Sequence, residues 1–319
     1  MRILLVAEEA AGQRALRSIS QRDDELVGVV TTLSGDASSP APIEKLAASV
    51  GCRLWPPEMV TSERFAAQVR DLETDILLNI HSLRIVHPEI VEAPGVGSFN
   101  LHPGPLPELA GLNVPSWAVY LGHDWHAVTL HWMQAGIDTG PIAYMSRFDI
   151  NDQDTGLSVS NKCVAQGVPL IDQLLDTASE NPELIPRIEQ DLKQRRYYGR
   201  RDIPFDGHLD WAQSANDICA FVRACDYGPF QSPWGRPDTS LDGVDMRILR
   251  VRKSGKPASA SPGTVVGISG EKAMVSTADE DIAVLTVEVD ERTCPASDML
   301  TVGQTFVTAG STGTPTPSS

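Results

Sequence analysis

The chain opens with Met1-Arg2-Ile3-Leu4-Leu5-Val6-Ala7, a stretch in which only Arg2 is charged. A short apolar run of this kind is typical of a strand that is buried on both faces of a parallel sheet. A turn is predicted at Glu8–Gly12, and helical spacing follows over Gln13–Ile19. The start of the chain therefore predicts a strand that leads into a helix, which is the basic unit of an α/β domain.

Strand and helix patterns keep alternating through residue 122. This order predicts a Rossmann-like α/β fold, a parallel-rich sheet with helices on both faces and right-handed crossovers. The sequence has neither a G-x-G-x-x-G motif after the first strand nor a P-loop, so it lacks the usual phosphate cradle for a nucleotide cofactor. The predicted strands are Glu25–Thr32, Arg53–Trp55 and Asp75–Ile80, the predicted helices are Ile43–Val50 and Ser62–Leu72, and a turn-rich loop is predicted at Ser34–Pro42.

The second half of the chain predicts a change of architecture. Short strands that are separated by glycines and polar turns indicate a small β-rich, barrel-like domain. We predict an N-terminal α/β domain over residues 1–194, a linker over 195–207, a C-terminal β-rich domain over 208–306 and a disordered tail over 307–319. The strands expected here are His126–Met133, Gly140–Ile150, Asp245–Lys253, Gly263–Ser269, Ala273–Thr277 and Ile282–Asp290, and the helices are Asp154–Leu175, Pro182–Gln194 and Ser214–Cys225.

The composition argues against several classes of protein. The 319 residues carry 26 Lys and Arg against 42 Asp and Glu, a net charge of −16, which disfavours nucleic-acid binding but leaves room for a local basic patch. The five cysteines are widely spaced without a C-x-x-C pair, so we expect reduced thiols, and no metal-ligand set is visible. No apolar run approaches the ~20 residues that span a membrane. The apolar start is too short for a signal peptide, so the sequence predicts a cytoplasmic protein.

The richest group of chemically useful side chains lies in Ser98–Pro107 (SFNLHPGPLP). Asn100 and His102 are two residues apart at the end of a predicted strand, so their side chains share one face of the sheet. Further along, Asp138 lies in a turn between two glycines, which could aim its carboxylate into a cleft. The sequence therefore offers an amide, an imidazole and a carboxylate as candidate site groups.

These three groups suit acyl transfer to an amine. An amide N–H can donate to an oxyanion, and a protonated imidazole adds a second bond and a charge if a carboxylate keeps its pKa of ~6.5 from falling. The carboxylate, or a water that it holds, can take the proton that the attacking amine loses. No Ser or Cys nucleophile is needed, so direct transfer between two bound substrates is the natural scheme. The alternative is structural, because Asn, His and Asp also satisfy backbone groups in loops and turns.

Two segments carry a resemblance to a known family. Ser98–Gly122 (SFNLHPGPLPELAGLNVPSWAVYLG) and Ala127–Ile142 (AVTLHWMQAGIDTGPI) resemble the 10-formyltetrahydrofolate-dependent formyltransferases, whose signature is Asn-x-His, a proline-bounded loop and a later Asp-Thr-Gly turn. His208-Leu209-Asp210-Trp211 and Ile218–Ala224 are similar to the start of the C-terminal domain of methionyl-tRNA formyltransferases. The resemblance covers most of the chain, to about residue 305, and implies a folate-dependent N-formyltransferase.

The resemblance also implies roles for individual residues. Asn100 and His102 would stabilise the oxyanion of a tetrahedral intermediate on the formyl carbon, and Asp138 would hold His102 and help to deprotonate the acceptor amine. The co-substrate would be 10-formyltetrahydrofolate. Arg84 could equally be a solvated surface charge, and the side chains of Ile85 and Val86 could equally belong to the core. The ring of the folate would lie against the backbone of Arg84, Ile85, Val86, His87, Gln134, Ala135, Gly136 and Ile137.

Members of this family differ in the acceptor to which they transfer the formyl group. Where tRNA formyltransferases carry an Arg-rich loop, this chain has the acidic and apolar Glu108–Leu112. Residues 205–319 hold 9 Lys and Arg against 15 Asp and Glu, which disfavours a tRNA-gripping domain. These features favour a small-molecule or carrier-bound primary or hydroxyl-amine, either an amino sugar or an ornithine-like amino acid. Methionyl-tRNA remains the alternative acceptor.

The sequence leaves the roles of three aromatic residues open. Trp117 could line a pocket or belong to the core, and Tyr197 and Tyr198 could stack on a sugar or base or could pack in the linker. Two further functions also remain open, a 10-formyltetrahydrofolate hydrolase and a folate-binding protein without activity. The intact Asn, His and Asp argue against the second, since a binding protein would be free to lose them.

Overall fold

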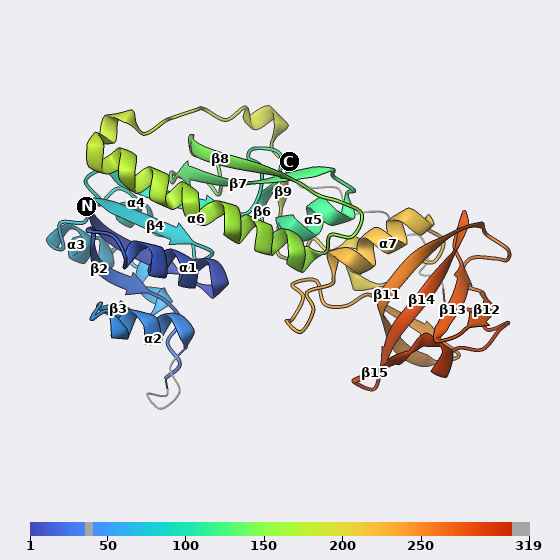
Figure 1. Cartoon of the computed structure of the whole chain (residues 1–319). Helices are drawn as coiled ribbons and strands as arrows, with labels where there is room; N and C mark the ends of the chain where they lie inside the picture. The colour runs from blue at the N-terminus through green and yellow to red at the C-terminus, as the bar shows by residue number, and fades with distance from the viewer. Residues whose placement is uncertain (36–40, 308–319) are drawn as a thin grey trace.

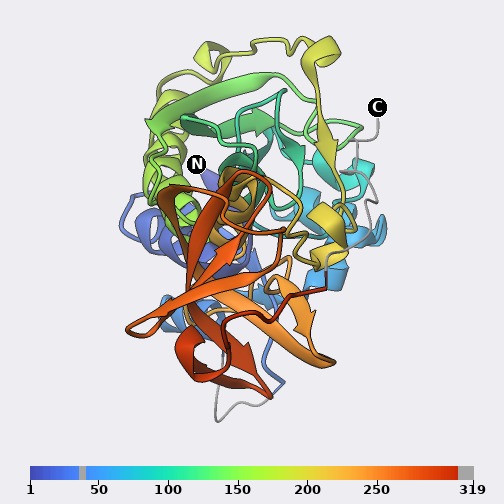
Figure 2. The same ribbon diagram turned by 90° about the vertical axis from the view of Figure 1, so that its right-hand side faces the viewer.

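The computed structural model describes residues 1–35 and 41–307. Residues 36–40 of the predicted loop and residues 308–319 of the predicted tail lie outside this part of the chain. The described residues form an N-terminal α/β part and a C-terminal β-rich part, joined by a linker that runs over the N-terminal part (Figure 1). Figure 2 shows the same linker, in yellow, from the side of the C-terminal part.

The N-terminal part is built on a seven-stranded sheet of order β3-β2-β1-β4-β5-β7-β8. The first five strands in this order pair in parallel, and the last two pair antiparallel. The predicted parallel-rich α/β fold is therefore confirmed. The strands are β1 (Arg2–Ala7), β2 (Glu25–Val30), β3 (Leu54–Trp55), β4 (Ile76–Ile80), β5 (Gly97–His102), β7 (Trp125–Trp132) and β8 (Ile142–Asp149).

Helices cover both faces of this sheet, as the alternation of buried side chains in β1 requires. Ile3 and Leu5 pack in the same core as α1, α2, α5 and α6, whereas Leu4 and Val6 pack with α3 and α4. Each face therefore buries its own apolar layer. The helices are α1 (Glu9–Ile19), α2 (Pro42–Ser49), α3 (Arg64–Asp71), α4 (Pro88–Val91), α5 (Val114–Tyr120) and α6 (Gly156–Glu180).

The turn predicted at Glu8–Gly12 is wrong, because α1 begins at Glu9. The glycine that suggested a turn serves a different purpose. A Cβ on Gly12 would lie 2.8 Å from the Cβ of Ala7, so only glycine lets the helix approach the strand this closely.

The C-terminal part contains the α-helix α7 and an antiparallel sheet of order β10-β11-β14-β13-β12, with β15 paired to β14. Trp211 is fully buried and stacks on Phe306 with ring centroids 4.6 Å apart, so a residue near the start of this part packs on one near its end. The elements are α7 (Ala215–Ala224), β10 (Asp238–Leu241), β11 (Val244–Pro257), β12 (Val265–Ser269), β13 (Lys272–Ser276), β14 (Glu280–Val289) and β15 (Arg292–Pro295).

The helix predicted over Pro182–Gln194 is wrong. The chain forms two short 3₁₀ turns, Pro182–Leu184 and Leu192–Gln194, with extended backbone between them. Ile188 exchanges both backbone hydrogen bonds with Ile142 of the edge strand β8. This pairing satisfies backbone groups that a helix would have satisfied internally.

The linker also contains a strand that was not predicted. β9 (Tyr197–Tyr198) pairs in parallel with β6 (Ala110–Gly111), in the loop that follows β5. Tyr198 stacks on Trp117 of α5 at 4.3 Å, and Trp117 meets the edge of Trp234 in the C-terminal part at 4.8 Å. Trp117 and Tyr198 are thus buried packing residues that connect the linker with both parts of the molecule.

Candidate active site

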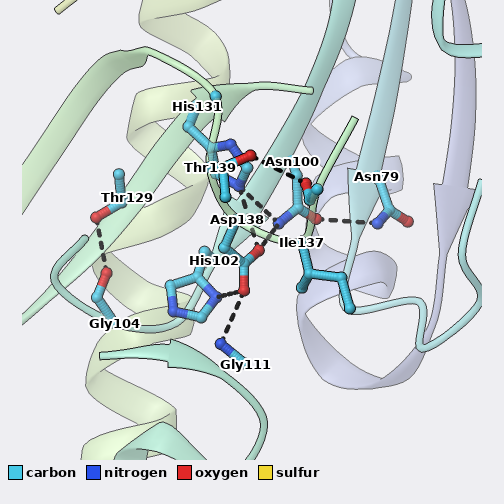
Figure 3. A network of polar contacts seen from close by, with 12 residues as sticks. Asn79, Asn100, His102, Gly104, Gly111, Thr129, His131, Ile137, Asp138 and Thr139 are labelled. Atoms are coloured by element: carbon cyan, nitrogen blue, oxygen red, sulfur yellow. Dashed lines mark hydrogen bonds and ion pairs between the residues drawn. The ribbon is translucent and has the colours of Figure 1, made fainter. Parts of the chain in front are cut away.

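The three residues predicted to carry the chemistry lie together at the carboxyl end of β5 (Figure 3). His102 and Asp138 are almost fully buried, with 3% and 8% of their surfaces exposed, and Asn100 is partly buried. His102 Nδ1 lies 3.5 Å from Asp138 Oδ2. Asn100 Nδ2 donates to Asp138 Oδ1 over 3.4 Å. The fold therefore joins the strand and the distant turn into one polar group.

Asp138 is held by its own turn and by the two segments around it. Its φ of +55° places it in the left-handed region, where a short polar side chain is tolerated. The backbone N–H of Gly111 donates to Oδ2 over 2.9 Å. From the other side, Gln190 Nε2 donates to the carbonyl oxygens of Asp138 and Gly140 over 3.0 and 2.6 Å. β6 therefore holds the carboxylate, and the segment that follows α6 holds the backbone of the turn.

The orientation of His102 is set by one hydrogen bond. Its Nε2 lies 2.6 Å from the carbonyl oxygen of Leu109, which can only accept, so Nε2 carries the proton. In the neutral ring, Nδ1 is therefore unprotonated and faces the Asp138 carboxylate. A proton that arrives at Nδ1 would be held between the imidazole and Asp138.

The electrostatics of the pair differ from the expectation of a charged imidazole. Burial lowers the pKa of His102 below its ordinary value of 6.5 and outweighs the attraction of Asp138. Burial alone would raise the pKa of Asp138, but His102, His131 and the Gly111 N–H hold it well below its usual range. These effects favour an ionised Asp138, and burial favours the neutral form of His102.

Two residues that sequence reasoning missed complete the polar group. Asn79 lies opposite Asn100 on the neighbouring β4 and donates to Asn100 Oδ1 over 2.9 Å. His131 lies opposite Asn100 on β7, donates from Nδ1 to the carbonyl of Trp132 over 2.9 Å, and accepts from Asn100 Nδ2 at Nε2 over 3.0 Å. A polar residue inside an otherwise apolar strand was the available signal for both. The register that brings them to Asn100 was not visible in the sequence.

The segment Arg84–His87 follows β4, and its side chains have separate environments. Arg84 is exposed and lies 3.8 Å from Glu58, Ile85 is 72% exposed, and Val86 is buried in the core. His87 Nδ1 accepts from the N–H of Glu89 and caps α4. The proposed folate contact thus rests on the backbone of this segment and on the exposed apolar face of Ile85.

The second predicted folate segment, Gln134–Ile137, forms the turn that carries Asp138. Gln134 Nε2 donates to the Thr139 carbonyl over 3.0 Å, and Thr139 Oγ1 donates to the Ala135 carbonyl over 3.2 Å. Gly136 has a φ of +101°, which the tight turn requires. Ile137 is 43% exposed and precedes Asp138 in the chain. This side chain offers an apolar surface next to the site.

Other chemistry can be assessed over the described residues. Within 1–35 and 41–307, no group of three or more His, Cys, Asp or Glu could hold a metal ion. No helix in those ranges has both the length and the apolarity to cross a membrane. All five cysteines are free, and burial raises the pKa of the Cys163 and Cys225 thiols, so these two are poor nucleophiles.

A hollow of about 640 Å³ lies in the C-terminal part, away from the residues described above. Asp238, Asp245, Glu288 and Arg247 contribute to its walls, and none of Asn100, His102 or Asp138 does. We therefore assign the chemistry to the polar group at β5 and not to this hollow, because a reacting site needs its acid–base groups in contact with the substrate.

Both parts of the chain match known proteins. Residues 3–174 match the family described as formyl transferase, and residues 204–302 match the formyl transferase C-terminal domain. A methionyl-tRNA formyltransferase of Alcanivorax borkumensis is 26% identical over 305 residues, which cover 93% of this chain and 89% of that protein.

Solved structures of related proteins show the same fold. An N-formyltransferase from Helicobacter canadensis, in complex with folinic acid and dTDP-3-aminofucose, superposes with a TM-score of 0.66 at 19% identity, covering 88% of this chain and 98% of that chain. The sugar 3N-formyltransferase WlaRD gives 0.67 at 17% identity, with 89% and 96% covered. HypX from Aquifex aeolicus, in complex with tetrahydrofolic acid, gives 0.63 at 16% identity over 93% of this chain, which spans 46% of HypX.

Proposed function

Because this chain belongs to the formyl transferase family, we propose that it is a folate-dependent N-formyltransferase that uses 10-formyltetrahydrofolate as its formyl donor. Its acceptor is a primary or hydroxyl-amine of a small molecule or of a carrier-bound substrate. The observation that carries the proposal is the contact of Asn100, His102 and Asp138 in one buried group. The folate compounds named for WlaRD and for the two other solved structures support the same kind of donor.

The donor side of the site fits a folate ring. Ile85 and Ile137 expose apolar side chains on the two segments that the family resemblance assigns to that ring. Exposed aliphatic groups beside loop backbone can pack on a flat heteroaromatic ring while backbone donors and acceptors bind its amide-like edge. Arg84, Val86, His87, Gln134, Ala135 and Gly136 complete the proposed backbone contacts.

The site residues can divide the work of the transfer. Asn100 can exchange its weak 3.4 Å contact with Asp138 for the formyl oxygen, where negative charge develops as the amine attacks. The Asp138 carboxylate, ionised at neutral pH, can accept the proton that the amine loses. His102 Nδ1 lies beside that carboxylate, so the imidazole can share the proton and donate to the formyl oxygen of the tetrahedral intermediate. When the bond between the formyl carbon and N10 of the donor breaks, this proton can pass to N10, and tetrahydrofolate leaves.

The acceptor class follows from charge. The loop Glu108–Leu112 carries no basic residue, and residues 205–319 are net acidic, with 9 Lys and Arg against 15 Asp and Glu. A domain that binds the phosphates of tRNA gains affinity from positive charge. A small or carrier-bound amine therefore fits this chain better than methionyl-tRNA.

The test is release of tetrahydrofolate from 10-formyltetrahydrofolate by the purified protein, with and without a panel of amines. The panel contains nucleotide-linked amino sugars, hydroxyornithine and charged methionyl-tRNA. We expect release that depends on one small amine. Release without any amine would identify a hydrolase, and folate binding without release under any condition would identify a non-catalytic folate-binding protein.

A second candidate is methionyl-tRNA formyltransferase. The observation in its favour is the relative of that name, which is 26% identical across 93% of this chain. Release that depends on charged methionyl-tRNA alone would establish this candidate and would overturn the charge argument.

A further inference from the structure

We propose that Arg195 and Tyr197 of the linker bind the phosphate group of the acceptor, so that the substrate is an amine that carries an organic phosphate. The inference rests on the proposed function, because it names the class of acceptor for the same site. Neither residue belongs to the catalytic group. The sequence placed Arg195 in a linker and left Tyr197 open between stacking on a sugar or base and packing in that linker.

Arg195 lies directly beside the catalytic turn. Its Nη2 donates to the carbonyl oxygen of Ile137 over 3.1 Å, and the next residue in the chain is Asp138. Its Nε is buried and has no hydrogen-bond partner among the described residues. The guanidinium thus reaches the site but uses only part of its donor capacity there.

Tyr197 lies beside the loop Glu108–Leu112, on the side of the Asp138 carboxylate that Gly111 contacts. A Cβ added to Gly111 would lie 2.9 Å from Tyr197 Cε2, and the Gly111 N–H is the group that donates to Asp138. The Arg195 guanidinium carbon lies 5.0 Å from the centroid of the same ring. Arg195, Tyr197 and Gly111 therefore form one edge of the site. This edge is cationic and aromatic, whereas the exposed side chains of Ile85 and Ile137 are aliphatic.

The arginines of the linker form no ion pair with a carboxylate of residues 1–35 or 41–307. The segment Arg195–Arg201 holds four arginines in a chain whose net charge is −16. Within the described residues, the arginines that pair with carboxylates are Arg2, Arg22, Arg70, Arg84 and Arg247, and the linker arginines are not among them. Of these arginines, Arg195 is partly buried beside the turn that carries Asp138, and a guanidinium in such a position can bind an anion.

A phosphate fits this edge better than a single carboxylate. A guanidinium binds phosphate oxygens through its planar fork, and the three further arginines of the segment add charge that suits a diphosphate or a phosphodiester. The Tyr197 ring offers a face for a sugar or a base. Within the proposed function, organic phosphate can come from a nucleotide-linked amino sugar or from the phosphopantetheine arm of a carrier.

The test measures binding directly and so does not depend on finding the acceptor. UDP, dTDP and phosphopantetheine are titrated into the wild-type protein and into Arg195→Gln by calorimetry, and tetrahydrofolate is titrated into both as the donor control. We expect one of the phosphate compounds to bind the wild type, and to bind Arg195→Gln about tenfold or more weakly, since a hydrogen bond to a charged group is lost. Binding of tetrahydrofolate should stay unchanged, and Arg195→Lys should recover part of the phosphate affinity.

Arg53→Gln is the matched control. Its guanidinium also lies over an aromatic ring, 4.7 Å from the centroid of Trp55, but it precedes β3 at the far edge of the sheet. This variant should bind the phosphate compounds as the wild type does. Equal loss in Arg53→Gln and Arg195→Gln would overturn the proposal.

Three other results would also overturn it. They are no binding of any phosphate compound to the wild type at millimolar concentration, an equal loss of tetrahydrofolate binding in Arg195→Gln, and tighter Arg195-dependent binding of tRNA than of the small phosphates. Failure of the proposed function would look different, because a wild type that binds the phosphates through Arg195 but transfers formyl to no amine retains the site and lacks the reaction.

Discussion

Alanine substitution of Asn100 and of His102 tests whether these side chains act in the reaction or only stabilise the fold. Asn100→Ala removes a donor to the developing oxyanion, and we expect kcat to fall by about 10²–10³. His102→Ala should have an effect of similar size, because it removes the ring that faces Asp138. Tetrahydrofolate release measures the loss, and tetrahydrofolate binding should stay close to that of the wild type. A variant that loses stability and folate binding together, without a selective loss in turnover, would contradict the assigned roles.

Asp138→Asn tests the pH dependence of the site. Asp138 raises the pKa of His102, although burial keeps it below 6.5. If the neutral imidazole is needed, kcat/KM of the wild type should rise with pH through a value below 6.5 and then level off. In Asp138→Asn this acid limb should move to lower pH, and kcat should fall by about 10²–10⁴ because the proton acceptor is lost. A limb that moves to higher pH would refute this account.

The site residues show what a sequence can reveal at this level. Asn100, His102 and Asp138 were predicted correctly as neighbours, because spacing placed the first two on one face and the family signature supplied the third. Asn79 and His131 were missed. Their role depends on the strand register that sets both opposite Asn100, and register is a long-range property.

The pairing of β6 with β9 can be tested at Gly111. Its φ is +92°, and a side chain there would collide with the Tyr198 carbonyl and the Tyr197 ring. Gly111→Ala should separate the two strands and displace the N–H that holds Asp138, so we expect kcat to fall about tenfold or more and unfolding free energy to fall by about 1–3 kcal/mol. Gly122→Ala is the control, since Gly122 also has a positive φ, +68°, but no atom lies within 4 Å of an added Cβ. Similar kcat values for both variants would argue against the role of β6.

Elements with strong local patterns were predicted well, and those formed by distant pairing were not. The strand at β1 and the helix at α6 follow from apolar runs and helical spacing. The helix predicted over Pro182–Gln194 failed because Ile188 pairs with β8. β9 was missed because two residues form a strand only when β6 is beside them.

The stability of the whole molecule in acid should depend on His126. The ring is fully buried, Nε2 donates to the Pro103 carbonyl over 2.8 Å, and burial lowers its pKa from 6.5 to about 4. Between these pH values the unfolded chain binds the proton and the folded chain does not, so unfolding free energy should fall by about 3 kcal/mol as pH decreases from 6.5 to 4. Urea unfolding at several pH values measures the change.

His126→Gln is the companion variant for this measurement. It should be less stable at neutral pH, because the ring and its hydrogen bond are lost, yet its stability should change less between pH 6.5 and 4 than that of the wild type. An unchanged slope in His126→Gln would show that other groups control the acid sensitivity.

The contacts that fix the linker at both ends limit the insertions and deletions that this chain can tolerate. Gln190 and Ile188 fix the segment at one end, and β9 fixes it at the other, with only a few residues between them. Deleting or inserting one residue in that interval would exchange the faces of Tyr197 and Tyr198, because side chains alternate along a strand. The ring that stacks on Trp117 would then face the turn that carries Asp138. Proteins related to this chain should therefore differ more in the amino acids between Gln190 and β9 than in the number of residues there.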